Sequence, residues 1–91
     1  MKSVHVKIKG LVQGVFFRSS TQEKARALSI CGWVKNCSDG SVEALFEANQ
    51  SEIDQILDWC YYGPANARVD SVDILSSKDC TKLQEGFNII Y

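Results

Sequence analysis

The sequence has few of the residues from which metal and redox sites are built. It contains a single histidine, His5, and four cysteines, none of which forms a C-x-x-C pair. The cysteines are Cys31, Cys37, Cys60 and Cys80. Zinc ligands usually lie closer together in the sequence than these cysteines do. We therefore expect the four cysteines to serve as small apolar side chains in or near the core, and the protein to bind neither a metal nor a cofactor.

Long apolar runs and an excess of charge of one sign are also missing. The first ten residues, MKSVHVKIKG, contain no apolar stretch of the kind that a signal peptide or a membrane span needs. The formal net charge is -1, so no overall field attracts nucleic acid or an acidic membrane. These features predict a cytoplasmic protein that binds neither, and nothing in them requires more than a monomer.

The remaining composition is that of an ordinary globular domain. Of 91 residues, 45% are hydrophobic and 23% are charged, which suits one small domain with a single modest core. No repeat, linker or low-complexity segment interrupts the chain, so we expect one domain over residues 1–91.

The first part of the chain predicts a strand followed by a helix. Apolar and polar residues alternate in VHVKIK, which places Val4, Val6 and Ile8 on one face of a half-buried strand. Residues 20–30 show helical spacing, and Ser20 with Glu23 forms a capping-box pattern at their start.

The middle of the chain predicts a hairpin and a second helix. Strand-like runs at 31–38 and 41–48 flank Asp39-Gly40, a strong hairpin signal. Ser51 is expected to cap the next helix, and Gly63 suits the left-handed position after its end.

Two further strands complete the order. Residues 67–76 alternate again, and GFNIIY at 86–91 is a short last strand. The order is strand, helix, strand, strand, helix, strand, plus the C-terminal strand. It predicts an α+β fold of the ferredoxin-like kind, a split βαββαβ sandwich with two helices on one face of an antiparallel sheet and a C-terminal edge strand.

The stretch GLVQGVFFR, residues 10–18, joins the first strand to the first helix. A helix N-terminus has unpaired N–H groups and a partial positive charge, so anions bind there readily. Gly10 and Gly14 would let a ligand approach the backbone, and successive N–H groups can form an anion nest. Arg18 adds a planar fork for two phosphate oxygens. The pattern fits a phosphate cradle, or a solvated arginine beside a turn whose glycines serve only its geometry.

A second stretch, GWVKNCSDGSV, covers residues 32–42. In a strand Val34 and Asn36 share one face, and Val34 suits the core side. The Asn36 amide could orient a water molecule, because it donates and accepts hydrogen bonds. The alternative is an asparagine that satisfies the backbone of the hairpin.

Together the two stretches resemble the signature motifs of the acylphosphatases. The matching positions are Gly10, Val12, Gln13, Gly14, Val15, Phe17 and Arg18 in the first, and Gly32, Trp33, Val34, Lys35, Asn36, Gly40 and Val42 in the second. GPANARV at 63–69 and GFNIIY are also similar to the family, so the resemblance covers nearly the whole chain. The sequence departs from the family at Ser29 and Ala48, where glycine is common, and both positions concern backbone geometry.

The resemblance implies hydrolysis of the carboxyl–phosphate bond of acyl phosphates. By motif, Arg18 would bind the phosphoryl group, and Asn36 would hold the attacking water. The backbone amides that would assist Arg18 are those of Gln13, Gly14, Val15, Phe16 and Phe17. The family needs neither a metal nor a covalent enzyme intermediate, and a phosphate or sulfate anion is expected to bind the loop.

Two other functions remain open at this point. The first is a binding module that keeps the phosphate cradle without turning substrate over, as acylphosphatase-like domains inside larger enzymes do. This chain keeps both Arg18 and Asn36, which favours an enzyme. Ferredoxin-like domains also bind nucleic acid through exposed sheet aromatics among basic residues, but the first strand presents His5, Lys7 and Lys9 without an aromatic.

Overall fold

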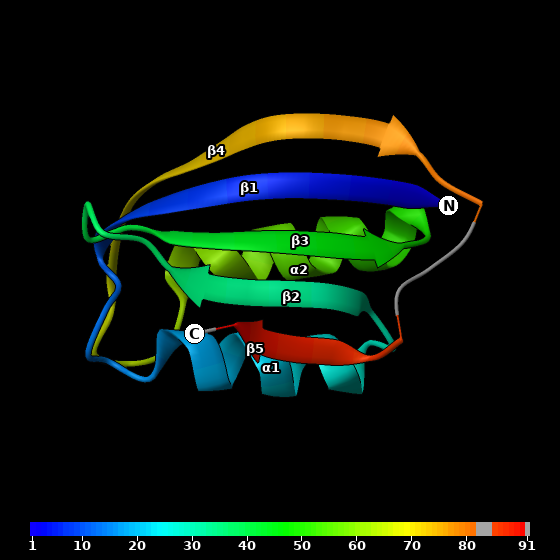
Figure 1. Cartoon of the computed structure of the whole chain (residues 1–91). Helices are drawn as coiled ribbons and strands as arrows, with labels where there is room; N and C mark the ends of the chain where they lie inside the picture. Colours follow the sequence, from blue (N-terminus) through cyan, green and yellow to red (C-terminus); the bar gives the residue numbers. More distant parts are fainter. Residues whose placement is uncertain (82–84, 91) are drawn as a thin grey trace.

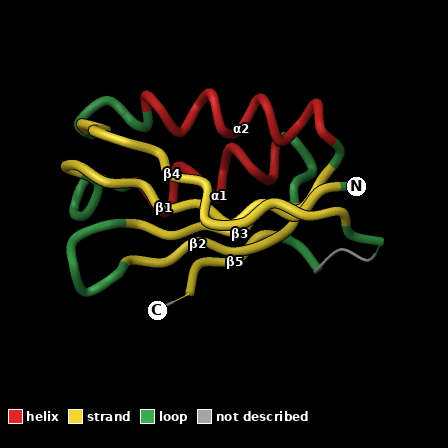
Figure 2. Tube along the Cα trace, turned by 90° about the horizontal axis from the view of Figure 1, so that it is seen from above, coloured by secondary structure: helices red, strands yellow, loops and turns green. Residues whose placement is uncertain are grey.

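The protein is a two-layer sandwich in which both helices cover the same face of one sheet (Figure 1, Figure 2). The computed structural model describes residues 1–81 and 85–90. The elements are β1 (Lys2–Leu11), α1 (Phe17–Ala27), β2 (Cys31–Asn36), β3 (Val42–Ala48), α2 (Gln50–Tyr62), β4 (Arg68–Asp79) and β5 (Phe87–Ile90). The predicted ferredoxin-like α+β fold is confirmed. No helix within the described residues is long and apolar enough to span a membrane.

The sheet has the strand order β4-β1-β3-β2-β5. β1 pairs antiparallel with β3 and β4, and β2 pairs antiparallel with β3. β5 takes the predicted edge position, but it runs parallel to β2, so the sheet is mixed rather than antiparallel throughout. The direction follows from the path of the chain, because a strand that returns from the far end of β4 must run the same way as β1 and β2.

The core lies between the sheet and the two helices. Val4, Val6 and Ile8 face the helices and are fully or almost fully buried, as their alternation predicts. The helices turn toward them the buried residues Phe17, Thr21, Ala25, Ile53, Ile56 and Cys60. These residues recur every three or four positions, the spacing of one helix face. Burying each large apolar side chain contributes about 1.5–3 kcal/mol.

The start of α1 differs from the prediction. The helix begins at Phe17, and Ser20 lies inside it, with its N–H donating to the Phe16 carbonyl at 3.0 Å. The predicted capping box of Ser20 and Glu23 is therefore wrong. Packing explains the earlier start, because the Phe17 side chain must enter the core as the chain leaves the loop. The Ser51 cap is also wrong, since α2 begins at Gln50 with Asn49 at its N-cap position.

The end of α1 has the backbone geometry of a Schellman motif. The Ser29 N–H donates to the Arg26 carbonyl at 3.1 Å, and the Ile30 N–H donates to the Ala25 carbonyl at 2.8 Å. Ser29 has φ 57, in the left-handed region that favours glycine. The helix thus ends at Ala27, earlier than the predicted residue 30.

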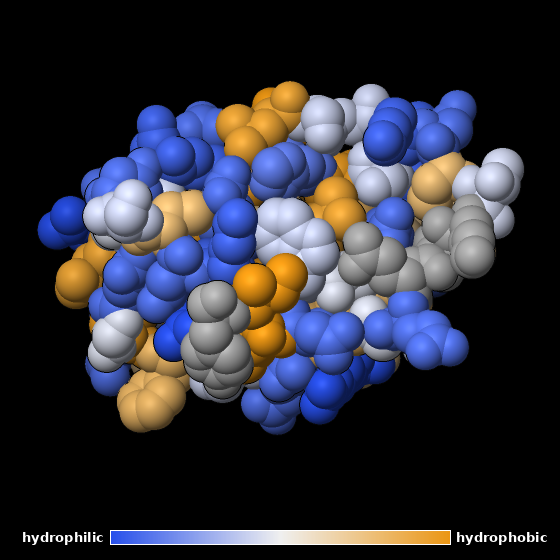
Figure 3. All heavy atoms as spheres, viewed as in Figure 1, coloured by the Kyte–Doolittle hydropathy of each residue, from blue (hydrophilic) through white to orange (hydrophobic). Residues whose placement is uncertain are grey.

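The face of the sheet that the helices leave uncovered is mostly hydrophilic (Figure 3). Trp33 lies on it with its ring centroid 5.4 Å from that of His5, and the Lys35 ammonium lies 5.4 Å from the Trp33 ring. At the hairpin end of this face, the Lys7 ammonium lies 2.8 Å from an Asp39 carboxylate oxygen. This uncovered face thus carries paired charges and a partly covered aromatic ring.

Candidate active site

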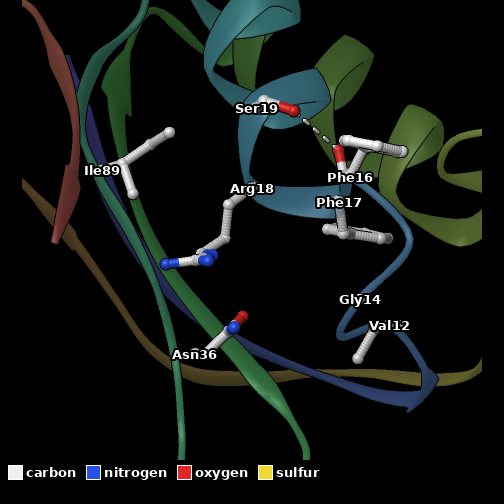
Figure 4. A pocket seen from close by; sticks show the side chains of 8 residues that line it. All are labelled: Val12, Gly14, Phe16, Phe17, Arg18, Ser19, Asn36 and Ile89. Atoms are coloured by element: carbon white, nitrogen blue, oxygen red, sulfur yellow. Dashed lines mark hydrogen bonds between the residues drawn. The ribbon is translucent and has the colours of Figure 1, made fainter. Parts of the chain in front are cut away.

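A pocket of about 300 Å³ opens where the β1–α1 loop, the first turn of α1, the end of β2 and β5 meet. Figure 4 shows Arg18 and Asn36 reaching into it from α1 and β2, with the loop around Gly14 on one side and Ile89 on the other. Its lining consists of Val12, Gly14, Phe16, Phe17, Arg18, Ser19, Asn36 and Ile89.

Two left-handed residues shape the loop of this pocket. Gly14 has φ 75 and Phe16 has φ 64. A Cβ on Gly14 would meet nothing within 4 Å, so glycine is required there by its φ and not for space. Phe16 holds the same unfavourable region at a cost of about 1–2 kcal/mol, and its side chain is 78% exposed. Strain of this kind at the N-terminus of a helix points to a functional loop.

Gly10 has a structural role rather than the predicted role in ligand approach. It lies in β1 with φ 134, and a Cβ there would lie 2.1 Å from the Arg68 carbonyl oxygen of β4. The glycine allows the two strand backbones to come together, and it does not line the pocket.

Arg18 lies in the first turn of α1, and its side chain points across the pocket toward Asn36 (Figure 4). That first turn contains no acidic residue. The positive end of the helix and the guanidinium therefore favour an anion in the pocket. Ser19 donates a hydrogen bond through Oγ to the Phe16 carbonyl at 3.2 Å and so ties the turn to the strained residue.

Asn36 is the last residue of β2 and shares its face with the buried Val34, as predicted. Its Oδ1 atom is buried and has no hydrogen-bond partner among the described residues. A buried polar atom without a partner costs about 1–3 kcal/mol, which a bound polar ligand or water would remove. The carbonyls of the hairpin are bound by another residue: Gln13 Nε2 donates to Cys37 O at 2.7 Å and to Ser41 O at 2.9 Å.

The pocket brings together most of the predicted site residues. Gly14, Phe16, Phe17, Arg18 and Asn36 line it, whereas Gln13 and Val15 do not. Sequence reasoning missed Val12, Ser19 and Ile89 as lining residues. Val12 and Ser19 flank the motif positions that were assigned, so their place in the sequence was a usable signal. Ile89 had no such signal, because only the pairing of β5 with β2 brings it to the pocket.

Ionisable groups beside the pocket face the other side of the sheet. The pKa of the Asp39 carboxyl is lowered from its ordinary value of 3.8, mainly because Lys7 donates a hydrogen bond to it. The Cys37 thiol donates to a Glu43 carboxylate oxygen at 3.0 Å. Burial, and after it this hydrogen bond, raises the pKa of the Cys37 thiol above its ordinary value of 9.0. The thiol therefore stays protonated at neutral pH and offers no thiolate nucleophile beside Asn36.

A model of the acylphosphatase family matches residues 4–89. The chain belongs to the acylphosphatase family. It is 46% identical over 91 residues to an acylphosphatase from Roseiflexus sp. (strain RS-1), covering 100% of this chain and 97% of the relative. It is 42% identical over 91 residues to an acylphosphatase from Syntrophus aciditrophicus (strain SB), covering 100% of this chain and 94% of the relative.

Solved acylphosphatases share the fold of this family member over its full length. The crystal structure of acylphosphatase from Bacillus subtilis superimposes with a TM-score of 0.94 at 28% identity, covering 100% of both chains. The acylphosphatase from Coxiella burnetii gives 0.86 at 34% identity, covering 98% of this chain and 92% of that chain. HypF of T. kodakarensis gives 0.84 at 26% identity, but only 12% of that chain is covered, so the fold also occurs within a larger protein.

Proposed function

We propose that this protein hydrolyses acyl phosphates to a carboxylate and inorganic phosphate in the pocket between α1 and β2. The observation that carries the proposal is the meeting of Arg18 and Asn36 across one pocket at the N-terminus of α1. The chain's membership of the acylphosphatase family supports the reaction class.

Arg18 binds the phosphoryl group in this proposal, together with the backbone amides of residues 13–17. The left-handed conformations of Gly14 and Phe16 curl the loop at the positive end of α1, a geometry that suits an anion nest. Phosphoryl transfer depends mainly on positioning and on stabilising charge on the equatorial oxygens. A phosphate or sulfate ion should therefore bind the same loop as a competitive inhibitor.

Asn36 holds the attacking water through its side-chain amide. Its unpartnered, buried Oδ1 provides an acceptor for a water proton, which would aim the water oxygen at the phosphorus of a group held by Arg18. The water oxygen forms a bond to phosphorus as the bond from phosphorus to the carboxyl oxygen breaks. The electron pair of the broken bond leaves with the carboxylate.

The reaction needs little acid or base assistance from the protein. A carboxylate leaving group has a pKa of about 4 and departs without protonation. The described lining residues include no histidine, carboxylate or thiol, so an oxygen of the substrate phosphate takes the proton of the water. A pH–rate profile controlled by a protein group with a pKa near 7 would contradict this step.

The decisive experiment is benzoyl phosphate hydrolysis in the presence of a metal chelator. We expect kcat to fall by roughly 10²–10³-fold in Arg18→Ala and in Asn36→Ala, the size seen when one transition-state donor is removed. Arg26→Ala and Asn66→Ala are matched controls, because both residues are exposed and lie outside the pocket. If the folded parent binds phosphate through Arg18 without turnover, the protein is a binding module and the proposal is wrong.

We further infer a monomeric, cytoplasmic protein that does not bind nucleic acid. The lysines of the open sheet face have carboxylate partners: Lys7 with Asp39, Lys9 with Asp73 and Lys35 with Glu43. Such pairing reduces the positive field that single-stranded nucleic acid needs. Salt-dependent binding of an oligonucleotide would overturn this inference, and size-exclusion chromatography tests the monomer.

A further inference from the structure

Gln13 connects the two halves of the pocket through its side chain. It belongs to the β1–α1 loop, next to Gly14, yet it does not line the pocket. Its carboxamide nitrogen donates both of its hydrogens to the β2–β3 hairpin, to Cys37 O at 2.7 Å and to Ser41 O at 2.9 Å. These bonds join positions 24 and 28 residues apart in the sequence.

The two acceptors of Gln13 belong to the turn that follows Asn36. The Cys37 N–H donates to the Ser41 carbonyl at 2.9 Å, and the Gly40 N–H donates to the Cys37 carbonyl at 3.2 Å. Two backbone hydrogen bonds therefore close the turn on itself. Cys37 follows Asn36 directly in the chain, so the Gln13 amide ties the segment after Asn36 to the β1–α1 loop.

We propose that Gln13 is a positioning residue that sets the distance between Asn36 and the phosphate-binding loop. The proposal rests on the function proposed above. The loop and Arg18 hold the phosphoryl group, and Asn36 holds the water, so the reaction depends on how the two parts lie with respect to each other. A misplacement of about 1 Å is enough to lower the rate of an oriented reaction by roughly 100-fold. No other side chain of the loop has a hydrogen bond to the hairpin among the bonds observed within residues 1–81 and 85–90.

The first test is Gln13→Met, which keeps the length of the side chain and removes its donors. We expect kcat for benzoyl phosphate to fall by about 10-fold while the inhibition constant of inorganic phosphate changes less than twofold. A role limited to stability would leave kcat of the folded fraction unchanged. Gln22→Met is the matched control, because Gln22 Nε2 also donates to a distant carbonyl, that of Phe87 at 3.1 Å, and does not line the pocket.

A double-mutant cycle with Asn36→Ala separates this inference from the proposed function. If Gln13 acts through Asn36, Gln13→Met lowers kcat less than twofold in the Asn36→Ala background. If Gln13→Met lowers kcat by the same factor in the parent and in the Asn36→Ala background, the positioning role is wrong and the proposed function stands. An Asn36→Ala variant with full activity overturns both.

A second variant, Gln13→Glu, gives a readout with a characteristic pH dependence. At neutral pH its carboxylate would face two carbonyl oxygens and donate nothing. The two carbonyl oxygens disfavour the carboxylate and so raise the pKa of this carboxyl above its ordinary value of about 4.3, and protonation restores one donor. We therefore expect the ratio of variant to parent kcat to rise as pH falls from neutral toward about 4. A ratio that stays constant contradicts the proposal.

Discussion

Replacing Ser29 with glycine should stabilise the protein. Ser29 occupies the position after the C-cap of α1, with φ 57, and its N–H and that of Ile30 already make the two hydrogen bonds of a Schellman motif. Glycine adopts this φ without the steric conflict that a Cβ causes. Ser29→Gly therefore relieves strain without changing the hydrogen bonds.

Two opposing contributions set the expected size of the gain. The left-handed conformation costs a residue with a side chain about 1–2 kcal/mol. Glycine gains more freedom in the unfolded chain, which offsets about 0.4–1 kcal/mol of this. The net gain is about 0.8 kcal/mol, which corresponds to a rise in Tm of about 3–6 °C for a domain of this size.

Thermal unfolding followed by circular dichroism measures the change. Ser51→Gly is the matched control, because Ser51 is the second residue of α2 and has no strain to relieve, and glycine in a helix costs up to about 0.5 kcal/mol more than serine. The same chemical change should thus raise Tm at residue 29 and lower it at residue 51. Activity should stay unchanged in Ser29→Gly, since the length of α1, about 16 Å, separates residue 29 from the pocket. A fall in Tm for both variants would refute the reasoning.

Three further predictions concern packing and ionisation. Gly63→Ala should destabilise the protein by about 1–3 kcal/mol in urea unfolding, because the new Cβ would lie 2.6 Å from a Phe17 ring carbon. Asp39→Asn should lower Tm at pH 7, and the gap to the parent should close as pH falls below about 4. The hydrogen bond from Lys7, which lowers the pKa of Asp39, stabilises the folded state only while the carboxyl is ionised. A difference in Tm between variant and parent that stays constant with pH would contradict this. Burial raises the pKa of the Cys60 thiol to about 12, so thiol reagents should modify it only after unfolding, as mass spectrometry would show.

Local patterns in the sequence were sufficient to predict the architecture. The alternation of Val4, Val6 and Ile8 fixed which face of β1 is buried, because a strand turns successive side chains to opposite faces. The same rule placed Asn36 on the side of Val34, and the structure confirms this. These features depend on neighbours in the chain, so no tertiary information was needed.

The features that the sequence did not reveal depend on contacts between distant segments. The capping pattern of Ser20 and Glu23 is a local signal, but the burial of Phe17 starts α1 three residues earlier. Gly10 stands in a stretch with the composition of a ligand-binding loop. Glycine is required there, however, because the β4 backbone lies too close for a Cβ. The donors of Gln13 point to a hairpin that no periodicity places next to the loop.

The most direct test of the account is to hydrolyse benzoyl phosphate in water labelled with heavy oxygen and to determine which product carries the label. A pocket in which Arg18 holds the phosphoryl group and Asn36 holds the water requires attack at phosphorus. We expect mass spectrometry to find the label in inorganic phosphate and none in benzoate. Label in benzoate would mean attack at the acyl carbon and would contradict the central claim.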